Sequence, residues 1–166
     1  MRIVLALLLM FANVTAAAPV VKFKKDNLVG AWTYVESYLE LPDGRRLEQF
    51  SDAPLGIFIL LENGWYSHII LRPDLPRVKS GVMMQATPEE ARLIAIGSLA
   101  HYGTYTVDEN KGTFTVTILH SDFPNFDGLQ QTRNVLQLDS ETLRYVNDVT
   151  NAGPGAVVTA TLKRIR

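Results

Sequence analysis

Apolar and polar residues alternate along much of the chain with the period of two that is typical of half-buried β-strands. On the first such segment Trp32, Tyr34, Glu36 and Tyr38 share one face. The pattern predicts strands over residues 32–40, 57–61, 65–71, 102–107, 113–120, 129–138, 143–146 and 156–164. Short strands with regular turn signals between them favour a sandwich or a barrel, and a closed barrel of about eight strands leaves room for roughly one small ligand.

Two local signals add a hairpin and a helix to this pattern. Glu62-Asn63-Gly64 separates two apolar runs, and Asn-Gly predicts a hairpin because both residues tolerate positive φ. Thr87-Pro88-Glu89-Glu90 predicts the start of the one clear helix, with Thr87 as its cap, Pro88 at the first helical position and Glu90 completing a capping box. Four residues supply an apolar stripe behind it: Leu93, Ile94, Ile96 and Leu99.

The first eighteen residues differ from the rest of the chain. Met1-Arg2 is a short positive start, residues 3–12 are almost wholly apolar, and residues 15–18 are small, as a signal peptidase requires. The apolar run is too short for a membrane-spanning helix, and a buried core helix fits Arg2 and the alanines poorly. We therefore expect a signal peptide over 1–18, a lead-in over 19–27 and a barrel over 28–166. The protein would then be secreted or periplasmic, without a stable membrane span after cleavage.

Composition excludes several classes of function. The net charge of −1 argues against a nucleic-acid partner. The chain has no cysteine, so thiol catalysis and thiolate metal sites are excluded, and its three histidines lack the close spacing of a zinc site. No phosphate-binding loop or nucleotide motif is present. We expect neither a metal nor a cofactor.

Several motifs resemble a known family. Leu28-Val29-Gly30-Ala31-Trp32 resembles the Gly-x-Trp opening of lipocalins. Further segments are similar, in order and spacing, to the microbial single-domain lipocalin-like family: Gly56–Ile59, Glu62–Ser67, Leu71–Asp74, Ala86–Glu90, Tyr102–Tyr105, His120 and Phe123–Phe126. The resemblance covers about residues 28–164. Asn63 departs from it, since Asp is usual there, and an export signal is not a general trait of the family.

The resemblance implies a fold and a range of functions. The fold is an all-β, eight-stranded antiparallel lipocalin-like barrel with one short α-helix. In lipocalins the Trp closes one end of the barrel beneath an Arg of the last strand, which makes Arg164 the candidate partner of Trp32 and Arg166 the alternative. Related barrels include enzymes that direct cyclisation or isomerisation of reactive intermediates. Fold alone does not assign such an activity.

The histidines are the main candidates for chemistry. His120 shares a strand face with Phe114, Val116 and Ile118, and the opposite face carries threonines, so we expect His120 inside the barrel. His68 shares a face with Tyr66, whereas His101 follows the helix and is expected to be solvated. Interior imidazoles of near-neutral pKa can exchange protons, and Tyr66 can donate a hydrogen bond. The predicted catalytic residues are His120, His68 and Tyr66.

A second set is predicted to hold the ligand. Its members could wall an apolar cavity, donate hydrogen bonds or bind an anionic group: Trp65, Arg72, Phe58, Tyr102, Tyr105, Phe114, Phe126 and Glu36. Each of these residues could instead have a purely structural role. The histidines and aromatic residues could be ordinary core, Arg72 could tie down a loop, and Glu36 is either a buried acid of raised pKa or a solvated charge.

Three functions fit these residues. The first is a cofactor-independent cyclase or isomerase that binds a small, largely apolar metabolite inside the barrel and orients it. The second is a carrier of a small lipophile without catalysis. The third, a protein-interaction or inhibitor module, has the least support. A catalyst should place at least two polar, titratable groups against its ligand, whereas a carrier needs mostly apolar walls.

Overall fold

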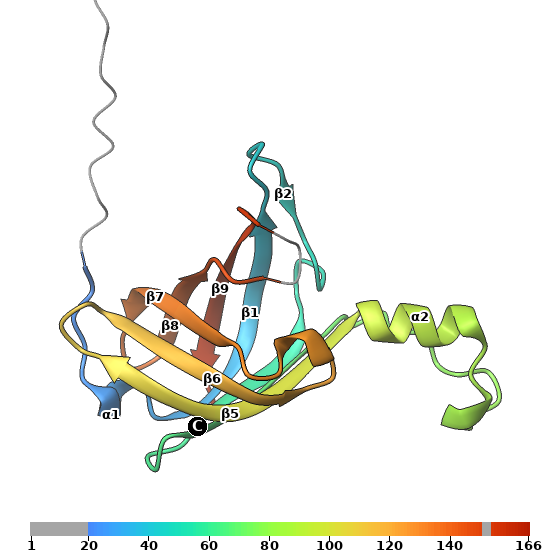
Figure 1. The fold of residues 1–166 in the computed structure, drawn as a ribbon, viewed down its shortest axis with the longest axis horizontal. Helices are drawn as coiled ribbons and strands as arrows, with labels where there is room; N and C mark the ends of the chain where they lie inside the picture. Colours follow the sequence, from blue (N-terminus) through green and yellow to red (C-terminus); the bar gives the residue numbers. More distant parts are fainter. Residues whose placement is uncertain (1–19, 151–153) are drawn as a thin grey trace, which may run out of the picture.

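The computed structural model describes residues 20–150 and 154–166, so the predicted signal peptide lies outside the described residues. Eight strands form a closed antiparallel barrel in which each strand pairs with its neighbour in the chain and β1 also pairs with β9 (Figure 1). They are β1 (Gly30–Glu40), β3 (Leu55–Leu60), β4 (Trp65–Leu71), β5 (Ser98–Asp108), β6 (Thr113–Ser121), β7 (Gln130–Leu138), β8 (Thr142–Asn147) and β9 (Val157–Arg164). The predicted fold class is confirmed.

The remaining elements are short. The two-residue strand β2 (Arg46–Leu47) pairs with the end of β1, and α1 (Lys25–Leu28) precedes β1. The 3-10 helices are η1 (Met83–Gln85) and η2 (Pro124–Phe126). The predicted helix is α2 (Pro88–Ile96), and Thr87 and Glu90 form the expected capping box. None of its residues is buried, and it projects to one side of the barrel in Figure 1.

The expected hairpin joins β3 and β4. Gly64 adopts a φ of +86°, and the Asn63 side chain accepts a hydrogen bond from the backbone N–H of Trp65. The turn therefore fixes the register, in which Phe58 lies opposite His68. The buried polar side chain of His68 therefore lies beside the buried aromatic residue Phe58.

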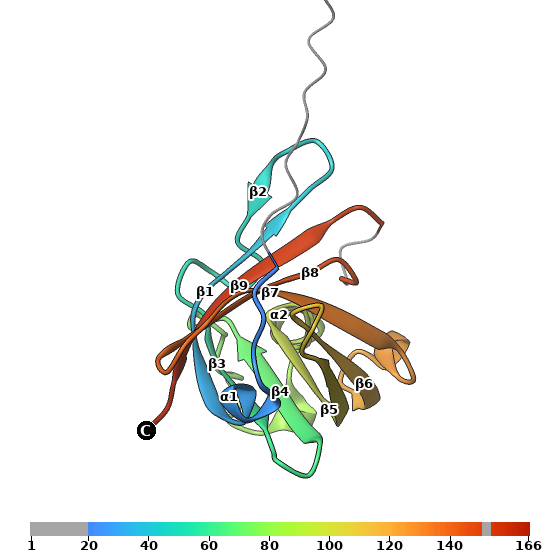
Figure 2. The same ribbon diagram turned by 90° about the vertical axis from the view of Figure 1, so that its left-hand side faces the viewer.

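One end of the barrel is closed by Trp32. Its side chain is fully buried, and its indole N–H donates to the carbonyl of Leu28 at 2.9 Å. The Arg164 guanidinium lies 4.0 Å from the centre of the Trp32 ring and donates to the carbonyl of Val29 at 2.7 Å. Arg164, not Arg166, is therefore the partner that the resemblance implied. Helix α1 lies at this end, and the β2 hairpin lies at the other (Figure 2).

The ladders of the barrel contain three register shifts, and those in the β1–β9 and β5–β6 ladders change which of the predicted site residues face the interior. In the β1–β9 ladder the register shifts between Tyr34 and Glu36, so that Tyr34 and Ser37 point inward while Glu36 points outward. The expected single face of Trp32, Tyr34, Glu36 and Tyr38 is therefore wrong beyond Tyr34. An extra residue in one strand shifts the alternation by one position.

The second bulge lies in β6. Tyr102 pairs with His120 and Gly103 pairs with Ile118, which leaves Leu119 as the extra residue. Phe114, Val116 and Ile118 are buried as expected, but beyond Leu119 the alternation is reversed. The prediction that His120 faces the interior is therefore wrong.

Candidate functional site

A cavity opens inside the barrel, toward the end opposite Trp32. It is lined from six strands and three connecting segments, and the volume open to the centres of water-sized molecules is about 50 Å³. Its polar lining comes from β1, β4, β5, β7 and β8: Tyr34, Ser37, His68, His101, Gln131, Arg133, Tyr145 and Asn147. The rest of its wall is Gln49, Phe50, Ile70, Leu99, Phe126, Val149, Thr150 and Val158. Such a space holds a few water molecules or one small functional group.

Two imidazoles form the centre of one wall. His68 and His101 are directly opposite each other in the β4–β5 ladder, and their ring centres are 4.4 Å apart with the planes 31° from parallel. Each has a tyrosine partner: Tyr34 bonds to Nε2 of His68, and Tyr66 bonds to Nδ1 of His101 at 2.9 Å. The Tyr34 hydroxyl also contacts the Tyr145 hydroxyl at 3.1 Å, which links the two sides of the cavity.

Burial keeps this network uncharged. Desolvation lowers the pKa of His68 far below its ordinary value, and the neighbouring His101 and Arg133 lower it further. Desolvation and the charge of Arg133 lower the pKa of His101 to about 3. Burial raises the pKa values of the Tyr34 and Tyr66 hydroxyls well above normal. At neutral pH both imidazoles are therefore neutral, and both hydroxyls keep their protons.

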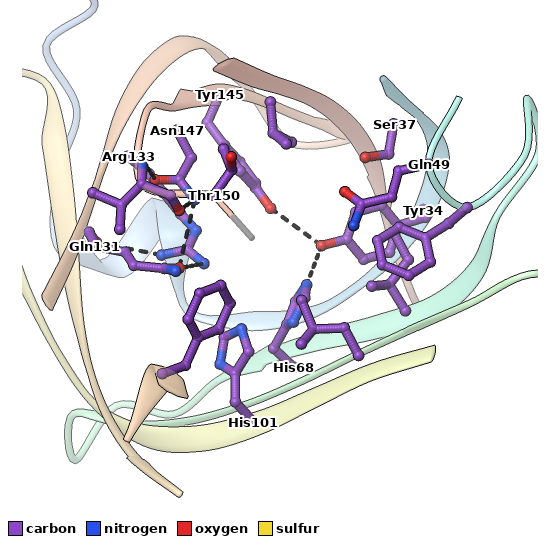
Figure 3. A pocket seen from close by; sticks show the side chains of 16 residues that line it. Tyr34, Ser37, Gln49, His68, His101, Gln131, Arg133, Tyr145, Asn147 and Thr150 are labelled. Atoms are coloured by element: carbon purple, nitrogen blue, oxygen red, sulfur yellow. Dashed lines mark hydrogen bonds between the residues drawn. The ribbon is translucent and has the colours of Figure 1, made fainter. Parts of the chain in front are cut away.

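Arg133 carries the charge of the cavity. Its side chain is only 2% exposed. Its guanidinium donates to the side-chain oxygen of Gln131 at 3.1 Å and to the Gln131 carbonyl at 3.3 Å. The guanidinium carbon lies 5.4–5.7 Å from the ring centres of Phe58, Phe114 and Tyr145. Figure 3 shows Arg133, Gln131 and Asn147 on the side of the cavity opposite Tyr34 and Ser37.

Six of the predicted site residues lie within the barrel. His68 and Phe126 line the cavity, whereas Tyr66 stands behind it as the partner of His101. Phe58 and Phe114 are fully buried and support Arg133 from the core. Tyr105 is buried away from the cavity lining, and its hydroxyl donates to the carbonyl of Leu61.

The other five point outward, and their predicted places at the ligand are wrong. His120 is exposed and lies 3.2 Å from the Asp127 carboxylate, because the bulge at Leu119 turns it outward. Tyr102 is turned outward in the same register and packs beside His120. Trp65 is 44% exposed because the even-numbered residues of β4 face inward and the odd-numbered residues, including Trp65, face outward.

The two charged residues of this group form surface ion pairs. Glu36 faces outward beyond the first bulge and pairs with Arg46. Arg72 follows the end of β4 and pairs with Asp74 at 2.8 Å, so it ties down a loop, which was its structural alternative. Neither charge reaches the cavity.

Sequence reasoning missed most of the polar lining. His101 was expected to be solvated, but β5 begins at Ser98, earlier than expected, and places His101 inside at 4% exposure. Gln131, Arg133 and Val135 alternate on the buried face of β7. The neighbouring exposed residues are polar as well, so the pattern of polar and apolar residues could not show which face was buried. The signal that the sequence did offer is that β7 has too few apolar residues on either face for an ordinary core strand, which indicates polar side chains in the interior.

The cavity offers no obvious metal site. Within residues 20–150 and 154–166, no group of three or more His, Asp or Glu side chains is placed to hold a metal ion. Among the same residues, no helix is long and apolar enough to cross a membrane.

Fold and cavity define a small calycin-type barrel with a polar interior, and the comparisons name its family. The model of the lipocalin-like domain matches residues 29–164, so the chain belongs to the lipocalin-like domain family. The resemblance stated from the sequence motifs is confirmed. No curated protein matches the chain.

Two solved structures are similar to the chain, and the second, with the higher TM-score, supports the fold. A lipocalin-like protein from Bacteroides uniformis is 16% identical, with a TM-score of 0.45, over 84% of this chain and 99% of that chain. The amine-binding protein of Rhodnius prolixus, solved as its tryptamine complex, is 15% identical, with a TM-score of 0.50, over 90% of this chain and 70% of that chain. Identities this low show a shared fold and leave the ligand to be argued from the cavity.

Proposed function

We propose that the protein binds a small organic molecule in the cavity of its barrel. The observation that carries the proposal is the concentration of buried polar groups around one interior space, namely two neutral imidazoles, three hydroxyls, two amides and a guanidinium. Burying polar groups costs free energy unless they are paired, and a fold stabilised by its core alone would place apolar side chains there. A set of polar groups that converges on one concave space is typical of a ligand site.

The size of the cavity limits what fits. Cavities for drug-sized ligands usually measure hundreds of cubic ångströms, which is several times the free space of about 50 Å³ here. A ligand must therefore be small, or it must place one polar group inside and extend outward past Phe50 and Phe126. The expected bulky, wholly apolar metabolite suits this interior less well than a ligand with a polar end.

A pair of matched substitutions tests the proposal. Ser37 lines the cavity, so Ser37→Leu should fill it, whereas Ser67 on the outer face of β4 allows the same substitution outside. Protein-detected NMR titrations with small acids, amides, alcohols and amines should shift the signals of Ser37 and Asn147 for at least one class of compound. Those shifts should vanish in S37L and persist in S67L. Shifts that survive S37L, or none with any class, would contradict binding in the cavity.

A second candidate is the cofactor-independent cyclase or isomerase activity, favoured by the contact chain His68–Tyr34–Tyr145 at the cavity wall. Imidazoles with such low pKa values are poor proton shuttles at neutral pH, so they and the hydroxyls would act as hydrogen-bond donors. Such donors, fixed in a dry site, stabilise an oxyanion or enolate as it develops. The catalytic roles predicted for His68 and Tyr66 would then be those of donors and positioning groups.

Product analysis tests this candidate. The purified protein is incubated with small metabolites of its source, and the products are identified by mass spectrometry. Tyr34→Phe and His68→Gln should lower turnover at least tenfold, whereas the exposed His120→Ala should retain it. Equal turnover in Y34F and the parent protein would contradict a role for the Tyr34 hydroxyl.

We also propose that the protein is exported. The proposal rests on the positive start, the apolar run and the small residues of positions 1–18. Mass spectrometry of the protein made from its full reading frame in a secreting host should find a mature N-terminus at Ala18 or Pro19. Retention of Met1 would contradict it.

A further inference from the structure

Arg133 is a buried charge without a counter-ion. It is 2% exposed, and no ion pair joins it to a carboxylate in the described parts of the chain. None of the side chains that line the cavity is acidic. An unpaired ion in a protein interior costs several kcal/mol, so such charges are normally paired or hydrogen-bonded to completion.

Hydrogen bonding inside the protein does not satisfy the guanidinium. It has five N–H hydrogens, of which two donate to Gln131. Its Nε is buried and has no partner among the described residues. Three aromatic rings offer only weaker cation–π contacts at 5.4–5.7 Å. The side chain therefore keeps donors for an acceptor that the described residues do not supply.

The groups around Arg133 favour an anion. The imidazoles of His68 and His101 and the hydroxyls of Tyr34 and Tyr66 are neutral, so none of them balances the charge. The Ser37 hydroxyl, on the opposite side of the cavity, can donate to an oxygen atom, and so can the Tyr145 hydroxyl. A cationic ligand would instead meet a like charge in a site of low dielectric constant.

Shape narrows the anion to one chemical group. A single guanidinium balances one negative charge, and its planar fork matches the two oxygens of a carboxylate. The free volume of about 50 Å³ has room for such a group but not for a bulky ring system beside it. The rest of the lining is largely apolar, with Phe50, Leu99 and Phe126 among its residues. The remainder of the ligand should therefore be narrow and apolar.

We propose that the cavity is a carboxylate site, in which the carboxylate of a small aliphatic organic acid pairs with Arg133 and its chain leaves between the apolar residues of the lining. This inference rests on the proposed function and adds the class of ligand. Gln131 is the positioning residue, because its side-chain oxygen accepts from Arg133 and, at 3.5 Å, from Asn147.

The test uses three compounds of equal length and different charge, hexanoate, hexanamide and hexylamine. Their affinities are measured near neutral pH by protein-detected NMR titration of the barrel. Hexanoate should bind at least ten times more tightly than the amide and the amine. Its shifts should include the signals of Arg133 and Asn147.

Two substitutions at the site and one outside it make the test specific. Arg133→Met should lower hexanoate affinity at least tenfold. Gln131→Glu keeps the shape of the side chain but places an internal carboxylate beside Arg133, so it should weaken hexanoate binding by a similar factor without removing the arginine. Gln130→Glu makes the same change at the exposed neighbouring position on β7 and should have no more than a twofold effect. Thermal melts of each variant establish that it is folded.

The outcomes separate this inference from the proposed function. Tighter binding of hexanamide or hexylamine at the same signals would overturn the carboxylate site and leave ligand binding in the barrel intact. Hexanoate binding that is unchanged in folded R133M or Q131E would do the same. Failure of all three compounds to shift any cavity signal would overturn both.

Discussion

At the scale of single residues, two polar side chains that line the cavity contain buried atoms without hydrogen-bond partners among the described residues. His68 Nδ1 and Arg133 Nε are both buried without a hydrogen-bond partner among the described residues. Core residues of a protein without a ligand are usually paired to completion, and exceptions need an explanation. Two of the three such exceptions among the described residues belong to side chains that line the same space, which is the arrangement expected where a ligand completes the pairing; the third, Arg144 Nε, lies outside the cavity lining.

The buried imidazoles predict how stability depends on pH. Their pKa values are lowered in the folded protein, so they add stability above the unfolded pKa of about 6.5 that is lost as pH falls toward about 3. The charged or titratable groups around them are Arg133 and the hydroxyls of Tyr34, Tyr66 and Tyr145, and burial raises the pKa values of the Tyr34 and Tyr66 hydroxyls, which therefore keep their protons in this window. Each imidazole should remove up to about 1.4 kcal/mol of unfolding free energy per pH unit.

Urea titrations between pH 6.5 and 5 measure this effect, since most carboxylates titrate lower. The double variant with His68→Gln and His101→Gln should lose most of the slope, whatever its absolute stability. His120→Gln, at the exposed histidine, is the control and should keep the slope of the parent protein. An unchanged slope in the double variant would show that the imidazoles are not buried in the neutral form.

Arg133 predicts a conflict between function and stability. Because its charge is buried without a counter-ion, Arg133→Met should raise the unfolding free energy by about 1–3 kcal/mol while it removes carboxylate binding. Arg77→Met, at an exposed loop position, should stay within about 0.5 kcal/mol of the parent protein. Chemical denaturation measures both variants. A clear loss of stability in R133M would mean that its bonds to Gln131 outweigh its desolvation.

At the scale of elements, the alternation of apolar and polar residues predicted which segments form strands, but not which residues of each strand face the interior. The pairs Asn63-Gly64 and Thr87-Pro88 stand where the turn and the helix begin, and both were read from local geometry alone. A bulge, however, depends on the partner strand. Nothing in the residues around Val35 or Leu119 shows that one more residue is present than the opposing strand needs. His120 was misplaced for this reason, and Glu36, for which both faces were open, is a solvated charge because it too lies just beyond a bulge.

The bulge in β6 depends on Gly103 of β5. A Cβ at that position would lie 2.0 Å from the carbonyl oxygen of Thr117, so no other residue fits without moving the strands apart. Gly103→Ala should therefore lower the unfolding free energy by about 2–4 kcal/mol. Thr104→Ala, at the exposed next position, should cost less than about 1 kcal/mol. Thermal melts compare the two, and equal effects would show that the bulge can relax.

At the scale of the whole molecule, the barrel has a closed end and an interior cavity, and each contains an arginine in different surroundings. At the closed end, Arg164 lies over Trp32 and donates to the backbone carbonyls of Val29 and Ser140. The Gly-x-Trp motif made this contact predictable, because it serves the fold. Arg133 instead lines the cavity for which we propose a ligand, and no fold-level pattern placed it there.

This division predicts opposite consequences for the same substitution. Arg164→Met removes a guanidinium whose donors are satisfied by carbonyls, and should lower the unfolding free energy by about 2–4 kcal/mol. It should leave the hexanoate affinity of the folded protein within twofold, because Trp32 and Arg164 do not line the cavity. Arg133→Met should do the reverse on both counts. Denaturation and NMR titration of the two variants side by side measure the difference. A matching loss of affinity in R164M would show that the closed end is coupled to the cavity through the barrel, and that the two regions do not act independently.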